Sequence, residues 1–163
     1  MLNLYSLPVS FPFLKLSIYS QKVGRHPNPN VGFFALDKLR QLSMNFLQIE
    51  ELANFKFQKE FLKPFEHILS NNPSPAIKDM VLSCLQQMIQ ARAKSLKSGW
   101  KTMFSVFIKA AREPSEPIVG LAFDIVRNIS KNYFDHVVVN NTFADYISCL
   151  VEFCKNKKHG KTA

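Results

Sequence analysis

Glycine and cysteine are scarce in this chain of 163 residues, and each shortage excludes a class of protein. Five glycines against fifteen phenylalanines argue against a disordered chain. Three cysteines, an odd number without a Cys-x-x-Cys pair, do not suit a disulfide framework. Because Cys84, Cys149 and Cys154 lie among apolar positions of expected helices, we predict buried thiols in a cytosolic protein.

The apolar N-terminal stretch lacks the features of a targeting segment. It has no basic start and no small-residue cleavage site, and Pro8 and Pro12 interrupt it. These observations disfavour both a signal peptide and a membrane-spanning helix.

Motifs that support enzymatic chemistry are also missing from the sequence. It contains no GxxxxGK[ST] or GxGxxG loop for phosphate and no GxSxG turn for a nucleophile. The four histidines show neither the HxxxH nor the HExxH spacing of a metal site. We therefore expect no catalytic residue, no metal and no cofactor.

Apolar residues at helical spacing are abundant instead, and they predict six or seven helices. The pairs Ser74-Pro75 and Ser115/Pro117 are typical of helix starts, with a hydroxyl cap before the proline. Another start is predicted at Glu50 and Glu51, and residues 137–139 are expected to form a loop. Pro64 predicts either a kinked helix or the first turn of a second one.

Phrases of sequence recur at an interval typical of helical repeats. ALDKLRQLS at residues 35–43 returns as AFDIVRNIS at residues 122–130. A shift of 42 residues also aligns Phe65 with Phe107 and Pro75 with Pro117. We therefore predict an all-α fold, a stack of antiparallel helix pairs.

Two Asp-x-x-Arg pairs occur in these repeats, Asp37 with Arg40 and Asp124 with Arg127. The spacing places each pair on neighbouring turns of a helix. Such pairs either hold adjacent repeats in register or are ordinary exposed pairs that contribute little to stability.

The net charge of +9 indicates a negatively charged partner such as nucleic acid, anionic lipid or an acidic protein face. Lysines and aromatic residues alternate in NFKFQKEFLKPF, as in surfaces that stack on single-stranded bases. However, Phe57, Phe61 and Phe65 recur every four residues, with Phe55 and Leu62 extending the same face. This spacing favours a core stripe over a base-stacking surface.

Four long phrases are similar to one protein family: KVGRHPNPNVGFFALDKLRQLSMNFL, EELANFKFQKEFLKPFEHIL, SPAIKDMVLSCLQQMI and SGWKTMFSVFIKAA. From about Gln21 to Phe153 the chain resembles the large, brefeldin A-inhibited guanine nucleotide-exchange factors for Arf GTPases, the Sec-seven/BIG family. The resemblance is to the region just downstream of their catalytic domain.

The resemblance implies an armadillo/HEAT-like α-solenoid without the exchange domain, and therefore a regulatory or scaffolding part that carries no catalytic residue. It further implies contact with an Arf-type small GTPase and with other domains of a parent exchange factor. Peripheral attachment to trans-Golgi or endosomal membranes and a role in vesicle-mediated protein transport are expected, and nucleic acid is not an expected partner.

The expected organisation has three parts: an irregular segment at residues 1–28, the helical-repeat region at 29–154 and a basic disordered tail at 155–163. The two ends depart from the family pattern, so the chain is expected to be a piece of a longer protein. The alternative is a free-standing helical-repeat adaptor or a basic nucleic-acid-binding module. Candidate partner contacts, which could equally form a solvated helix face, are Arg40, Asn54, Lys56, Gln58, Lys59 and Lys63.

Overall fold

The computed structural model describes Lys22, residues 26–52 and residues 54–156. The predictions for Pro8 and Pro12 and for the lysines after residue 156 lie outside this part of the chain. The limits of the two terminal segments therefore stay predictions.

The described part of the chain contains seven α-helices, one 3-10 helix and no strand, so the prediction of an all-α fold is confirmed. The helices are α2 (Pro29–Phe46), α3 (Gln58–Asn71), α4 (Pro75–Arg92), η1 (Ala93–Ser95), α5 (Gly99–Ala111), α6 (Glu116–Asn132), α7 (Phe134–Val139) and α8 (Phe143–Lys155). None of them is both long and apolar enough to cross a lipid bilayer.

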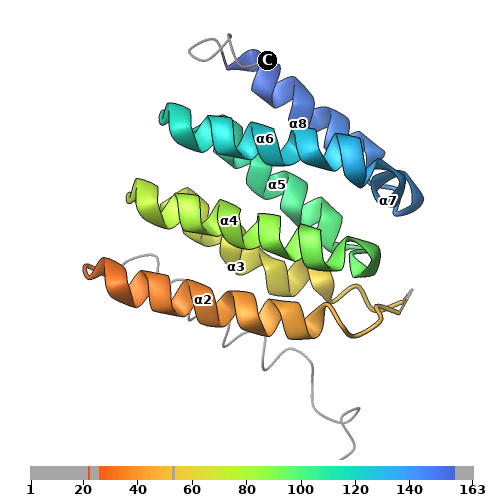
Figure 1. The fold of residues 1–163 in the computed structure, drawn as a ribbon, viewed down its shortest axis with the longest axis horizontal. Coiled ribbons are helices and arrows are strands. Elements are labelled where there is room, and N and C mark those ends of the chain that lie inside the picture. The colour runs from red at the N-terminus through yellow and green to blue at the C-terminus, as the bar shows by residue number, and fades with distance from the viewer. Residues whose placement is uncertain (1–21, 23–25, 53, 157–163) are drawn as a thin grey trace, which may run out of the picture.

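The long helices are arranged in two layers (Figure 1). Helices α2, α4 and α6 lie side by side in one layer, and α3, α5 and α8 lie side by side in the other. Contacts of α3 with α4 and of α5 with α6 join the layers. Successive helices thus form antiparallel pairs that stack along one direction, as the repeated phrases predict.

Proline marks the starts of the three helices in the first layer. Pro29, Pro75 and Pro117 each occupy the first or second position, where the missing N–H costs no helical hydrogen bond. Asn28 caps α2 because its side chain accepts a hydrogen bond from the amide of Asn30 at 2.9 Å. The start at Ser74 is confirmed, but its hydroxyl makes no capping hydrogen bond.

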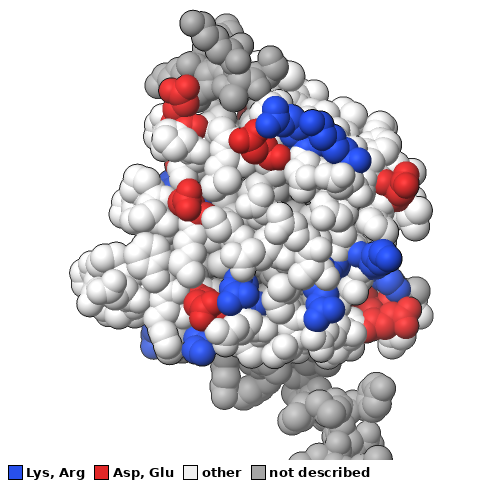
Figure 2. All heavy atoms as spheres, in the orientation of Figure 1, with Lys and Arg blue, Asp and Glu red and all other residues white. Residues whose placement is uncertain are grey.

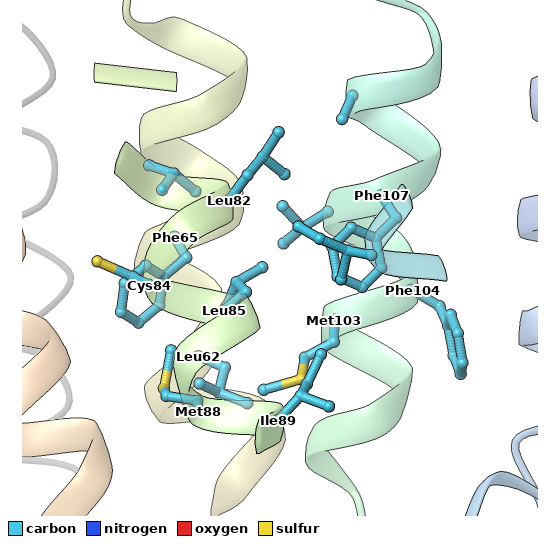
Figure 3. Close-up of a cluster of buried hydrophobic side chains, with 14 of the residues drawn as sticks. Leu62, Phe65, Leu82, Cys84, Leu85, Met88, Ile89, Met103, Phe104 and Phe107 are labelled. Atoms are coloured by element: carbon cyan, nitrogen blue, oxygen red, sulfur yellow. The ribbon is translucent and has the colours of Figure 1, made fainter. Parts of the chain in front are cut away.

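The core lies between the layers and runs along the whole stack. Figure 3 shows Leu62 and Phe65 of α3 and Leu85 of α4 facing Met103 and Phe107 of α5. All five side chains are fully buried, as is the chain's one tryptophan. The core assignment of Phe57, Phe61 and Phe65 is therefore confirmed, which removes these rings from any base-stacking surface.

Three predictions about helix limits are settled by tertiary contacts. The helix expected at Glu50 and Glu51 begins only at Gln58. Pro64 lies inside the single helix α3, so the prediction that it stands in the first turn of a second helix is wrong. The run from Val137 to Val139 belongs to α7, and the predicted loop is wrong because burial of Val137 stabilises this short turn of helix.

Some side chains predicted to be buried are exposed. Phe55 is 44% exposed because it precedes α3 and does not follow the helix's period. Cys154 is also exposed, whereas Cys84 and Cys149 are buried as predicted.

Candidate interaction surface

The candidate contact residues lie mainly around the start of α3. Asn54 and Lys56 belong to the connection between α2 and α3, and Lys59 and Lys63 are on the first two turns of α3. All four are exposed, as predicted. They form the centre of an exposed lysine-rich segment that the sequence pattern identifies.

Gln58 differs from its neighbours, and its predicted exposure is wrong. It is fully buried, and its Nε2 donates a hydrogen bond to the carbonyl of Ser95 at 2.8 Å. Its Oε1 accepts hydrogen bonds from the amides of Lys97 at 2.7 Å and Gly99 at 3.3 Å. Gln58 therefore ties α3 to the connection between α4 and α5 and is not available to a partner.

Glu51 forms a second tie at the same place, which the sequence analysis missed. It is only 4% exposed, and its carboxylate accepts hydrogen bonds from the amide of Gln58 and the amide of Ser98, both at 2.9 Å. The Ser98 hydroxyl also donates to it at 2.5 Å. Because α3 begins at Gln58 and Ser98 precedes α5, one buried carboxylate stabilises the N-termini of two stacked helices.

Another hydrogen bond between α3 and α5 brings a further lysine next to the predicted ones. The Thr102 hydroxyl donates to the carbonyl of Lys59 at 3.0 Å, which places the exposed Lys101 of α5 beside the start of α3. We call Lys56, Lys59, Lys63 and Lys101 the basic surface. Only Lys63 in this set forms an ion pair with a described residue, Glu60 at 2.7 Å.

Arg40 is separate from the basic surface. It lies on α2 and pairs with Asp37 at 2.7 Å, and the Arg40 guanidinium holds the pKa of Asp37 below its ordinary value. Its side chain is 26% exposed, and α2 lies in the layer of α4 and α6. The structure therefore does not bring Arg40 together with the lysines of α3.

The two Asp-x-x-Arg pairs bond within their own helices, as ordinary i,i+3 pairs do. Other residues link neighbouring helix pairs. Lys78 of α4 reaches Glu113 before α6 at 2.6 Å, with both side chains at most 15% exposed. Arg112 contacts Glu152 of α8 at 2.9 Å, and hydrogen bonding to this arginine lowers the pKa of Glu152.

The described residues offer little for catalysis. They contain no group of three potential metal ligands. Burial raises the pKa of the Cys84 thiol to about 11 and that of Cys149 to about 12, so neither is a ready nucleophile. A shallow groove of about 570 Å³ over α4 and the start of α6 is lined by apolar side chains, serines and Asp79, without a histidine or cysteine.

Charged side chains on one face of the molecule are divided into small groups. Figure 2 shows the face formed by α2, α4 and α6, where charged side chains occur in small separate groups on a largely uncharged surface. A protein that tracks a nucleic-acid backbone needs a continuous basic groove or stripe. This face does not provide one.

The stacked helix pairs define an all-α helical-repeat protein. A family model described as Mon2/Sec7/BIG1-like, HDS matches residues 45–128, which include the basic surface. The chain belongs to this Sec7-like HDS family.

Curated relatives agree with this assignment. The chain is 44% identical over 146 residues to the ADP-ribosylation factor guanine nucleotide-exchange factor sec72 of Schizosaccharomyces pombe. It is 50% identical over 139 residues to the human brefeldin A-inhibited guanine nucleotide-exchange protein 1. These matches cover 90% and 83% of this chain but only 8% and 7% of the relatives. The chain thus corresponds to a small part of large exchange factors.

Proposed function

We propose that this chain is a non-catalytic regulatory or scaffolding part of a large Arf guanine nucleotide-exchange factor. It acts through protein–protein contacts in vesicle-mediated protein transport at the Golgi and endosomes. Its partners are an Arf-type small GTPase and other domains of the parent protein, and its location is cytoplasmic and peripheral to trans-Golgi or endosomal membranes.

The observation that supports this proposal best is the extended similarity to curated exchange factors, which includes the whole of α3 and its surroundings. A stack of helix pairs presents long surfaces to partners and has no need of a reactive centre. The proposal therefore assigns contact, and not nucleotide exchange, to this part of the chain.

The proposed contact is made by the basic surface together with Asn54. Lys56, Lys59 and Lys101 have no acidic partner among the described residues, so their charges are available to carboxylates of another protein. Charge complementarity of this kind speeds association and selects partners. Arg40 stays a separate candidate for a contact made by the α2 layer.

Binding of the purified chain to Arf loaded with GTP and with GDP tests the proposed partner. Retention of the GTP form with weaker retention of the GDP form is expected. A parallel measurement of nucleotide release from Arf should show no acceleration by this chain. Acceleration would contradict the assignment of a non-catalytic role.

Charge reversal tests the proposed surface. Lys56→Glu with Lys59→Glu should weaken Arf binding about tenfold or more, because complementary charges become repulsive. The matched control is Lys38→Glu with Lys131→Glu, which changes the net charge equally on exposed positions of α2 and α6. Equal weakening by both pairs would indicate attraction by net charge alone and would refute a defined surface.

The same preparations test the alternative of a nucleic-acid-binding module. Titration with single-stranded DNA over a range of salt concentrations should give weak binding. Tight binding with a steep salt dependence and no preference between the two forms of Arf would replace the proposed function with that alternative.

A further inference from the structure

Three exposed apolar side chains lie on the connection between α2 and α3. Ile49 is 55% exposed, Leu52 is 65% exposed and Phe55 is 44% exposed. Figure 1 shows the described residues of this connection at one side of the stack, outside the two helices that they join. A connection at the surface usually presents polar residues, so an exposed apolar group indicates an interaction site.

This apolar group is held in place by the core beneath it. Glu51, between Ile49 and Leu52, is fixed by its hydrogen bonds to Gln58 and Ser98. The amide of Phe55 donates to the carbonyl of Leu52 at 3.0 Å. The ring of Phe55 packs on the buried Phe57 with centroids 5.8 Å apart. A group whose geometry is fixed before binding loses less conformational entropy when it docks.

Charges of both signs surround the apolar group. Lys56, Lys59 and Lys101 are unpaired among the described residues, while Lys97 bridges the carboxylate of Glu50 at 3.4 Å and the carbonyl of Glu51 at 3.2 Å. Glu50 is itself 84% exposed. A uniformly anionic membrane would attract the lysines but repel this glutamate. The mixed pattern favours a protein surface with carboxylates at defined positions over a membrane.

We propose that Ile49, Leu52 and Phe55 form an apolar docking element that inserts into a pocket on a protein partner, with carboxylates at its rim that meet Lys56, Lys59 and Lys101. This inference rests on the proposed function and names the residues that make its contact. The apolar side chains provide the buried centre of the interface, and the lysines provide its charged rim. Neither Ile49 nor Leu52 belongs to the periodic pattern that identified the other candidates.

The test compares Leu52→Asp and Phe55→Asp with Val139→Asp in the intact chain. Val139 is 79% exposed on α7, so the control places the same charge at a more exposed apolar position far along the sequence. The probes are GTP-loaded Arf, the isolated exchange domain of the human relative, and neutral and anionic lipid vesicles. Circular dichroism of each variant checks that the helices are retained.

We expect the two loop variants, Leu52→Asp and Phe55→Asp, to weaken protein binding by about tenfold or more. Val139→Asp should bind as the wild type does. Unchanged binding of the loop variants would overturn the docking element while leaving the proposed function intact. Loop-dependent binding of the exchange domain without Arf binding would support the docking element and remove Arf as the proposed partner. Loop-dependent binding of anionic vesicles alone, or no binding of any probe, would overturn the inference.

Discussion

Removal of the Glu51 carboxylate should destabilise this fold far more than removal of its neighbour Glu50. Glu51→Ala deletes three hydrogen bonds and leaves the amides of Gln58 and Ser98 without their acceptor. An unsatisfied buried donor costs about 1–3 kcal/mol, so the variant should lose about 2–5 kcal/mol of unfolding free energy. That is a large fraction of the roughly 5–15 kcal/mol that stabilises a typical domain.

Urea unfolding followed by circular dichroism measures this loss, and amide hydrogen exchange locates it. Faster exchange is expected at Gln58 and Ser98, because both amides lose the same acceptor. Glu50→Ala is the control, since Glu50 is 84% exposed and its contact with Lys97 is 3.4 Å long. Such a surface pair contributes at most about 1 kcal/mol. Equal effects of the two substitutions would refute the role assigned to the buried carboxylate.

Three further predictions concern the core and the thiols. Phe65→Ala should cost about 3–5 kcal/mol of unfolding free energy because Phe65 is fully buried. Phe34→Ala, at a position 64% exposed, should cost much less, and similar unfolding midpoints would contradict this. A thiol reagent near neutral pH should modify Cys154 in the folded chain and spare Cys84 and Cys149 until denaturant is added. Burial raises the pKa of the Cys84 thiol from 9.0 to about 11. The contribution of this neutral thiol to the free energy of unfolding is therefore retained below pH 9.0 and should fall as the pH rises toward 11. A free energy of unfolding that stays constant over this pH range would contradict the prediction.

Local sequence patterns predict most helices of this molecule because one-sided burial imposes a helical period. The recurrence of apolar residues every three or four positions in α3 and α6 corresponds to the buried faces that the structure shows. The Ser-Pro pair before α4 likewise marks a true start. These signals work because both the pattern and its cause lie within one helix.

The start of α3 fails this local reasoning because its determinants are distant in sequence. Gln58 and Glu51 are positioned by the connection before α5, 37 to 47 residues away. An acidic residue near a helix start usually acts on its own helix, so Glu51 suggests a start where none occurs. Pro64 shows the same effect: burial of Phe61 and Phe65 on both sides of it keeps the helix continuous.

The candidate surface combines both kinds of information. The helical period correctly turns Lys59 and Lys63 outward, and it correctly buries Phe61 and Phe65 of the same helix. However, when the same period is extended to the residues before α3, it places Phe55 in the core and makes no prediction for Leu52. The helix start at Gln58, which the hydrogen bonds of Glu51 to Gln58 and Ser98 hold in place, shows where the period stops. The proposed apolar docking element therefore lies at a boundary that local pattern misplaces, where tertiary hydrogen bonds hold the backbone before α3 outside the helix.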